Sequence, residues 1–537
     1  MIFALWPAVR YGATLRSAVL MVLCVALAGC VTLQENYPAP PSYAFDRPEE
    51  TTLGRAAAVL QTQHPGLSGY RLIQGGVAAL MTRAAIADLA ERAIDAQYYV
   101  YQPDAAGAFL LERLIAAAER GVRVRLLLDD YALGFEDVAL VKLVDAHPQI
   151  EIRVFNPFPY RARWTRPLQI ALNLDRLGMR MHNKVFVADG QKAVVGGRNI
   201  GDHYFEVQEA SNFRDVDVLA SGPIVKEIGR QFDDYWNSPL AVPVGAFGVT
   251  LSERWGQQER DELRRFASEP QGPHAQYERR KKEFTDRLLT GSADLVWADA
   301  VAIAEQPVRG VPDPAKSARE LSQITRTLSD MRRTARKEVV MVMAYYVPGR
   351  RAVENISEMV GRGVRVRILT NSLASTDVVA VHAGYASYRP SLLAAGVELH
   401  EFRVDAERPA PQDHVMRRGS TESALHAKVI VYDRRFIWIG SANTDPRSRR
   451  LNTEAGLLIE SDDLAERLLK GLERDFSPRQ SWRLALEADA DPDAGRIVWT
   501  GEVDGKEVRL TEEPGAGLLR GLEYWFYSIL PGIENLL

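Results

Sequence analysis

The chain carries one short chemical motif twice. The first copy is His182-x-Lys184-x4-Asp189 followed by Gly196-Gly197-x-Asn199, and the second is His426-x-Lys428-x4-Asp433 followed by Gly440-Ser441-x-Asn443. A neutral imidazole can attack phosphorus, and a protonated one can give a proton to a leaving alcohol. Lysine and asparagine side chains can offset the negative charge that grows on a phosphodiester in the transition state. The two copies therefore predict phosphodiester chemistry that needs no metal ion.

Chance is a poor explanation for this repetition. One copy alone could be accidental, with His182 a polar residue at a strand edge. However, the chain has 55 arginines and only 11 lysines, and both motifs carry lysine at the same place. Two intact copies at matching positions indicate a duplicated site.

The residues around each motif predict how it is held. Apolar runs at 185–188 and 429–432 predict strands, on which a His and a Lys two apart point to the same face. Turns are expected at Asp189-Gly190 and after Tyr432, with a returning strand at 436–439. Gly and Asn then stand where the chain leaves that strand, where free backbone N–H groups can meet a phosphate.

The repeat extends well beyond the motifs. Gly-Val-Arg-Val-Arg at 121–125 returns at 363–367, each time after a helix-like stretch and before an apolar strand. We also match the segment 96–101 with 342–347. Strands that alternate with helical stretches predict two similarly built halves with α/β layers.

The composition is that of a folded protein. The 537 residues are 46% hydrophobic and 25% charged, with a formal net charge of −4. These values exclude a mainly disordered chain and a polytopic membrane protein. The weak acidity disfavours a nucleic-acid binder. The two cysteines, Cys24 and Cys30, both precede the folded body and exclude a disulfide framework there.

The N-terminus has the pattern of a bacterial lipoprotein signal. Two arginines precede the uncharged run 17–29, which ends in Leu27-Ala28-Gly29-Cys30. This pattern predicts cleavage before Cys30 and a lipid anchor on its thiol. The alternative is an uncleaved anchor at 17–34. We expect a protein of the bacterial cell envelope on the periplasmic side, in either membrane.

The expected organisation has six parts. They are a signal peptide (1–29), a Pro-rich tether (30–55), a first lobe (56–240), a charged helical connector (241–312), a second lobe (313–480) and an extension with an amphipathic tail (481–537). The stripe of Ile324 and Leu328 predicts a helix that packs on the core. The tail, 518–537, suits either a membrane surface or a docked terminal helix.

The two motifs resemble those of the phospholipase D superfamily. Further segments are similar to bacterial cardiolipin synthases of the C-type class: 68–101, 156–158, 180–184, 195–202, 370–374, 381–385 and 451–454. This resemblance implies two similar α/β lobes, each a sheet flanked by helices, that are related by a pseudo-two-fold axis and bring both motifs into one cleft. It implies phospholipid substrates at a membrane surface, namely phosphatidylglycerol with phosphatidylethanolamine as another candidate. The residues call for no cofactor or metal, the net acidity disfavours a nucleic-acid substrate, and the sequence does not reveal a protein partner.

The resemblance also assigns roles to residues. His182 matches the nucleophile and His426 the general acid and base, while Lys184, Lys428, Asn199 and Asn443 match phosphate binders. Asp215 and Glu454 match the acidic residues that orient the histidines, and Asp189 and Asp433 complete the motifs in a mainly structural role. Gly197 stands where many members have Ser, as at Ser441, and its backbone N–H can serve instead. The leading function is transfer of a phosphatidyl group to make cardiolipin; the alternatives are a phospholipase D hydrolase and a phosphodiesterase or nuclease.

Overall fold

The computed structural model describes most of the chain from residue 33 to residue 530. The residues not described within that span are 35, 134–140, 142–143, 145–146, 161–164, 208–210, 249–256, 259–260, 262–264, 266–268, 270–271, 291–294, 308–321, 406–421, 488–495 and 516. The expected signal peptide and Cys30 lie outside the described residues. No helix among the described residues is long and apolar enough to cross a membrane.

The first lobe is built on an eight-stranded run of a mixed sheet, in the order β1-β8-β6-β5-β2-β3-β4-β9. Strands β2, β3 and β4 are parallel, and the others pair antiparallel. The bounds are β1 Ser68–Ile73, β2 Ala93–Tyr98, β3 Arg123–Asp129, β4 Ile150–Phe155, β5 Val185–Ala188, β6 Lys192–Gly196, β8 Asp217–Ser221 and β9 Ala241–Pro243. The parallel strands are almost entirely buried, as expected where helices cover both faces of a sheet.

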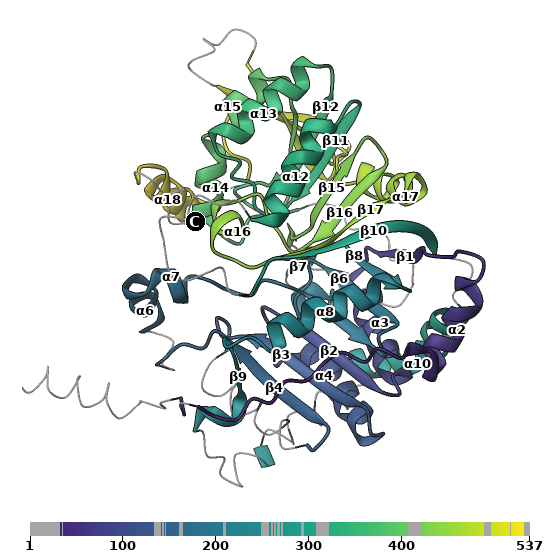
Figure 1. Ribbon diagram of the computed structural model, residues 1–537. Helices are drawn as coiled ribbons and strands as arrows, with labels where there is room; N and C mark the ends of the chain where they lie inside the picture. The colour runs from purple at the N-terminus through teal and green to yellow at the C-terminus, as the bar shows by residue number, and fades with distance from the viewer. Residues whose placement is uncertain are drawn as a thin grey trace, which may run out of the picture.

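The second lobe repeats this plan and extends it. Its strands follow the order β10-β17-β16-β15-β11-β12-β13-β18-β19-β20, with β11, β12 and β13 parallel. The bounds are β10 Val296–Ala304, β11 Glu338–Met343, β12 Arg365–Asn371, β13 Glu398–Phe402, β15 Lys428–Tyr432, β16 Phe436–Gly440, β17 Ala455–Glu460, β18 Ser481–Leu486, β19 Ile497–Val503 and β20 Lys506–Leu510. Figure 1 shows the second lobe above the first. The predicted fold class of two similar α/β lobes is confirmed.

Helices flank the strands in both lobes. The first lobe carries α2 Thr52–Gln61, α3 Gly76–Leu89, α4 Ala105–Glu119, α6 Arg166–Leu172, α7 Leu174–Leu177 and α8 Ile224–Trp236. The second carries α12 Gln323–Thr334, α13 Arg350–Gly361, α14 Val379–Ala386, α15 Arg389–Ala394, α16 Pro446–Arg450, α17 Asp462–Glu473 and α18 Leu518–Ser528. The expected helix with buried Ile324 and Leu328 is α12.

The two lobes share one sheet and one core. Strand β1 pairs antiparallel with β10, which joins the two halves into a continuous sheet. A single apolar cluster includes Val185 and Val187 of the first lobe with Val429, Val431 and Leu468 of the second. The motif strands thus back onto a common interior, which fixes the lobes relative to each other.

The expected connector, 241–312, contains parts that belong to the sheet and to the first lobe. Strand β9 pairs with β4, and β10 lies between the lobes. Helix α10, Pro273–Thr290, packs on α3 with Tyr277, Phe284 and Leu288 buried. Its run of charged residues is the face that remains outside.

Sheet register corrects one detail of the sequence repeat. Val185 pairs with Gln97, and the equivalent Val429 pairs with Val342. Residue 97 therefore corresponds to 342, whereas the match of 96–101 with 342–347 is one residue out. Side-chain similarity alone set that match, and a shift of one residue changes which face a strand residue occupies. As a result Tyr99 has Ala344 as its counterpart.

Candidate active site

His182 is positioned by backbone contact with the opposite lobe. It lies between α7 and β5, and its backbone N–H donates to the carbonyl of Thr453 at 2.8 Å. The Thr453 N–H donates to the carbonyl of Arg180 at 2.9 Å. This short parallel contact brings Glu454 to the imidazole, with 2.8 Å between Glu454 Oε2 and His182 Nδ1.

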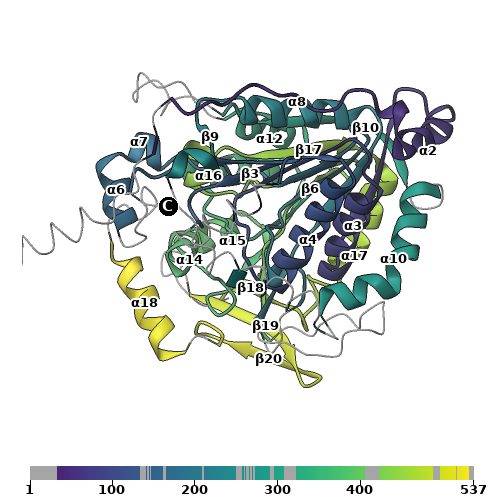
Figure 2. The same ribbon diagram turned by 90° about the horizontal axis from the view of Figure 1, so that it is seen from below.

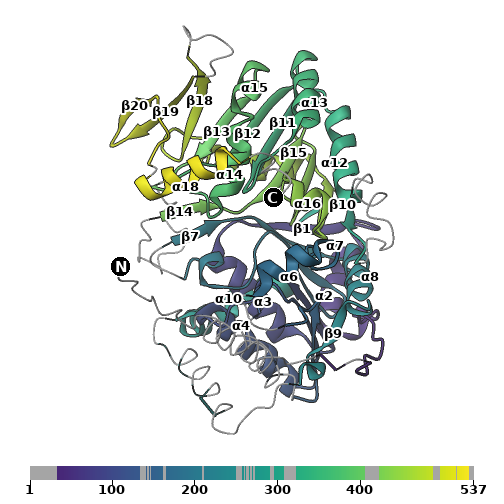
Figure 3. The same ribbon diagram turned by 90° about the vertical axis from the view of Figure 1, so that its left-hand side faces the viewer.

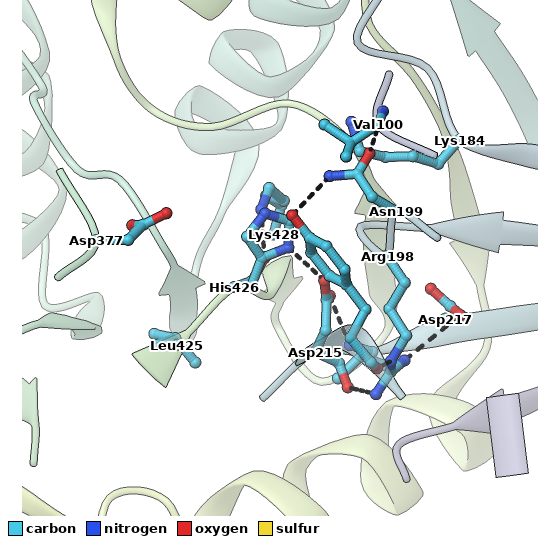
Figure 4. A network of polar contacts seen from close by, with 12 residues as sticks. Val100, Lys184, Arg198, Asn199, Asp215, Asp217, Asp377, Leu425, His426 and Lys428 are labelled. Atoms are coloured by element: carbon cyan, nitrogen blue, oxygen red, sulfur yellow. Dashed lines mark hydrogen bonds and ion pairs between the residues drawn. The ribbon is translucent and has the colours of Figure 1, made fainter. Parts of the chain in front are cut away.

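His426 is positioned in the matching way. Strand β7, Ser211–Arg214, pairs parallel with β14, Glu422–Leu425, across the lobe boundary. The N–H groups of His426 and Ala427 both donate to the carbonyl of Arg214. The next residue, Asp215, then places Oδ2 2.7 Å from His426 Nδ1 (Figure 4). Each acidic residue therefore pairs with the histidine of the other lobe, and each dyad exists only when the lobes are together.

The two carboxylates have different supports. Ser441 Oγ donates to Glu454 Oε2 at 2.5 Å. On the other side a Cβ at position 197 would lie 2.5 Å from Asp215 Oδ1. The Asp215 carboxylate therefore occupies the space that a side chain at 197 would need, which explains why glycine replaces serine there. The backbone of Asp215 is held by Arg198, whose guanidinium donates to its carbonyl and pairs with Asp217 at 3.4 Å (Figure 4).

Burial keeps both imidazoles neutral in the free protein. It lowers the pKa of His182 to about 4, helped by Lys184 and opposed by Glu454. It also lowers the pKa of His426 well below the ordinary value, helped by Lys428 and opposed by the charge of Asp377. Burial alone would raise the pKa of Glu454, but His182 and Lys184 lower it, so this carboxylate is ionised. An ionised carboxylate only accepts, so His182 carries its proton on Nδ1 and leaves Nε2 unprotonated.

Lys184 and Lys428 are both almost completely buried beside the histidines. Each Nζ donates to the carbonyl of the histidine in its own motif. Burial lowers the pKa of Lys428 to about 8 and that of Lys184 well below its ordinary value. Burying two cations at one site is costly; Glu454 and Asp215 offset part of this cost, and a phosphodiester would supply further negative charge.

The two asparagines differ in how they are engaged. Asn199 accepts from the Val100 N–H at 3.2 Å and donates to the Tyr204 hydroxyl at 2.9 Å. Asn443 has a buried side-chain oxygen without a hydrogen-bond partner. The side chain of Asn199 is thus used to hold the loop around it, whereas the side-chain oxygen of Asn443 can still accept a hydrogen bond.

Asp189 and Asp433 fix strand ends. Asp189 accepts the N–H groups of Glu91, Arg92 and Ala93, and Asp433 accepts those of Arg336, Lys337 and Glu338. Both aspartates have φ of 52°, in the tight turns that the sequence predicts. None of these bonds involves a histidine. Asp189 ties the first motif hairpin to the start of β2, and Asp433 ties the second to the start of β11.

Nothing in the described part of the chain forms a cluster of three or more His, Cys, Asp or Glu side chains fit to hold a metal ion. The positive charge at the site comes from the two lysines.

Comparison with known proteins agrees with this geometry. A family model described as "Cardiolipin synthase, PLD-like domain" matches residues 85–236 and 328–476. The chain is 37% identical to cardiolipin synthase C of Escherichia coli (strain K12), over 89% of this chain and 98% of that protein. The chain belongs to the phospholipase D-like cardiolipin synthase family. It is accordingly a phospholipase D-type phospholipid phosphatidyltransferase, as the motifs predict.

Two more distant members of the comparison extend the picture. Cardiolipin synthase B of Escherichia coli (strain K12) is 27% identical over 70% of this chain and 72% of its own. The crystal structure of phosphatidylserine synthase from Haemophilus influenzae Rd KW20 superposes with a TM-score of 0.52 at 15% identity. It covers 82% of this chain and 95% of that one, which shows that the two share a fold.

Three site residues of this cardiolipin synthase family member were missed by sequence reasoning. The ring of Tyr99 lies edge-on to His182 at 5.0 Å, and that of Tyr204 edge-on to His426 at 5.1 Å. Asp377 is exposed, accepts from the Tyr345 hydroxyl at 2.8 Å and faces the His426 side of the site (Figure 4). With the corrected register, the sequence shows that the two lobes differ at this position, with Tyr99 in the first and Ala344 in the second. Nothing in the sequence marks Asp377, which precedes α14.

Proposed function

We propose that this protein is a membrane-associated phosphatidyltransferase that makes cardiolipin from phosphatidylglycerol and a second phospholipid. We propose further that the reaction passes through a phosphohistidine intermediate. The observation that carries the proposal is the pair of buried His–carboxylate dyads, each completed across the lobe boundary. Family membership supports the same chemistry.

In the first step His182 Nε2 attacks the phosphorus of the donor phospholipid. The N–P bond forms, the bond from phosphorus to the headgroup oxygen breaks, and protonated His426 gives its proton to that oxygen. Lys184 and Lys428 offset the charge on the phosphoryl oxygens as the transition state develops. Glu454 stabilises the positive charge that His182 acquires when it becomes phosphorylated.

In the second step a hydroxyl of phosphatidylglycerol enters where the headgroup left. His426 Nε2 takes its proton, the new oxygen–phosphorus bond forms, and the N–P bond to His182 breaks. Cardiolipin leaves and His426 is again protonated for the next donor. The balanced products are cardiolipin and the free alcohol of the donor headgroup.

A carboxylate near each histidine acts against the effect of burial. The exposed carboxylate of Asp377 raises the pKa of His426 against the effects of burial and Lys428. Glu454 acts in the same direction on His182. A bound phosphodiester anion would raise both histidine pKa values, so that one imidazole can hold the proton that the leaving alcohol needs.

We place the protein in the cell envelope on the periplasmic side, held by a lipid on Cys30. The support is the sequence Leu27-Ala28-Gly29-Cys30 after a short uncharged run. The expected tether is not a free linker: Arg153 donates to the Pro40 carbonyl at 2.7 Å, and the Ala44 N–H donates to Asp233 at 2.9 Å. A lipid on Cys30 would therefore hold the first lobe close to the lipid surface.

The test is lipid analysis in a bacterial strain that lacks all cardiolipin synthesis. Expression of the chain should restore cardiolipin, and expression of the His426→Ala variant at the same level should not. Accumulation of phosphatidic acid without cardiolipin would show a hydrolase with water as acceptor. With purified protein, headgroup-labelled phosphatidylethanolamine and phosphatidylglycerol supplied separately as donors would release labelled ethanolamine or glycerol and so identify the donor.

A further inference from the structure

Helix α18 presents its apolar side away from the protein. Five of its residues and its C-cap residue, at spacings of one, three and four, are more than half exposed: Leu518 (82%), Leu519 (83%), Leu522 (55%), Trp525 (59%), Phe526 (51%) and the C-cap Ile529 (55%). The opposite side holds the helix on α14, where the Tyr524 ring lies 5.9 Å from that of His382. A surface helix of a soluble protein normally turns its apolar side inward. This helix is docked the other way round.

The first lobe has a smaller feature of the same kind. In α6, Leu168 and Leu172 are 62% and 79% exposed and stand four residues apart, on one face of the helix. The inner face of α6 is held by buried Arg166 and Gln169. Tyr160, 52% exposed, lies just before this segment, and its backbone bonds to the Gln169 amide.

Helix α18 is bonded to a loop of the active site. The guanidinium of Arg520 donates to the carbonyls of Ala374 and Thr376. The next residue is Asp377, which acts on His426. The apolar stripe of α18 is thus fixed relative to the second catalytic histidine.

Helix α6 is bonded to the active site in an equivalent way. Arg166 donates to the carbonyls of Tyr131 and Leu133. The Tyr131 ring stacks on Tyr99 at 5.6 Å, and Tyr99 lies against His182. Each histidine therefore has an exposed apolar helix tied to the loop beside it.

The two helices lie on one side of the molecule. Both are at the left in Figures 1 and 2, and both face the viewer in Figure 3. We propose that these exposed residues form one docking surface for a phospholipid bilayer, with the active site between its two parts. We call it the apolar rim, made of Leu168, Leu172, Leu518, Leu519, Leu522, Trp525, Phe526 and Ile529.

A bilayer is the occupant that fits the chemistry of the site. This inference rests on the proposed function, in which both substrates keep two acyl chains in the membrane. A rim contributed by both lobes lets those chains stay in lipid while the headgroups reach the histidines. Leucine, tryptophan and phenylalanine at one exposed face are typical of helices that lie in the membrane interface. The rim would orient the site, whereas a lipid on Cys30 would only tether the chain.

Quenching of tryptophan fluorescence tests contact with lipid directly. The full chain has nine tryptophans and is reconstituted in vesicles whose phosphatidylcholine carries bromine on its acyl chains. Bromine quenches the wild type, and Trp525→Phe should remove a large part of that quenching. Equal quenching in the wild type and in Trp525→Phe would overturn the proposal, because Trp525 would then not reach the acyl region.

Charged substitutions test whether the rim matters for turnover. The variant Leu519→Glu/Leu522→Glu should lower the rate on phosphatidylglycerol vesicles by about tenfold or more, and Leu172→Glu should also lower it. The matched control is Val59→Glu, because Val59 is 65% exposed and its helix, α2, lies on the opposite side of the molecule from α6 and α18 (Figure 2). All of these side chains are exposed, and an unchanged unfolding midpoint would confirm an intact fold.

A soluble short-chain phosphatidylglycerol separates docking from chemistry. The rim variants should turn it over within about twofold of the wild type, because it needs no bilayer. If the rim variants act on vesicles as fast as Val59→Glu does, the proposal that the apolar rim docks on the bilayer is overturned. Failure of the wild type on every phospholipid would instead refute the proposed function, while the bromine experiment would still decide whether α18 meets lipid.

Discussion

His182 of the first lobe and Glu454 of the second lie 2.8 Å apart, 272 residues from each other in the chain. The Glu454→Gln substitution removes the negative charge that stabilises a charged His182 and keeps the shape of the side chain. We expect transfer to fall by about 10²–10⁴-fold with an unchanged fold. The measurement is kcat/KM on phosphatidylglycerol.

Glu460→Gln is the matched control for that loss. Glu460 is the last residue of β17, the strand that begins directly after Glu454, and it pairs with Arg435 at the surface, where an ion pair contributes little to stability. Its activity should be that of the wild type. A Glu454→Gln protein as active as this control would show that His182 works without its carboxylate.

The motif aspartates should matter for stability more than for chemistry. Asp189→Ala leaves three backbone N–H groups near β2 without their acceptor. We expect the free energy of unfolding to fall by about 2–4 kcal/mol. Denaturant titration measures it, with the surface substitution Asp463→Ala as control. A folded Asp189→Ala protein that is as stable as the control but inactive would assign Asp189 to the chemistry instead.

The dependence of activity on pH should follow the buried lysines. Lys428 is charged below its pKa of about 8 and neutral above it. Since the neutral form no longer offsets phosphate charge, kcat/KM should fall as the pH rises through about 8. Lys428→Arg keeps its charge to higher pH and should move the fall upward, at a lower maximum rate. An alkaline fall at the same pH in both proteins would exclude Lys428 as its cause.

Sequence reasoning predicts the parts of the site better than their partners. The duplicated motif, the buried strands after each lysine and the turns at Asp189 and Asp433 follow from local pattern, because apolar runs and turn residues act over a few positions. The partner of each histidine depends on segments that meet across the lobes: β7 with β14 for His426, and residues 180–182 with residue 453 for His182. No local signal specifies such contact. The sequence therefore places Asp215 downstream of the first motif and Glu454 downstream of the second, without showing that each pairs with the histidine of the other lobe.

Other features depend on register and space. Tyr99 was matched with the wrong residue of the second lobe because similar side chains outweighed the one-residue shift that the sheet imposes. In the sequence, Gly197 differs from its counterpart Ser441 without an evident reason. In the structure the reason is steric, because the Asp215 carboxylate fills the space that a side chain at 197 would need. Which face of α18 points outward is set by its packing on α14. The periodicity of the tail predicts an apolar face but does not show whether that face is docked or exposed.

Lipid attachment is tested at Cys30. We expect radiolabelled palmitate to enter the wild-type protein and not the Cys30→Ser variant, which should remain an uncleaved precursor. Cys24→Ser is the matched control and should label normally, because Cys24 lies inside the segment that is removed. A wild-type protein that takes up no palmitate would favour an uncleaved anchor at 17–34.

The most direct test of the mechanism uses a phosphatidyl donor whose leaving group is p-nitrophenol. Because p-nitrophenolate leaves without a proton, attack by His182 no longer requires His426. The His426→Ala protein should release one p-nitrophenolate per active site and then stall with the phosphatidyl group on His182, since the next alcohol or water lacks its base. His182→Ala should give no burst of p-nitrophenolate, and a donor labelled in its phosphatidyl group should leave no label on the protein. A burst in His182→Ala, or label found on His426 in the wild type, would contradict the assignment of His182 as the nucleophile.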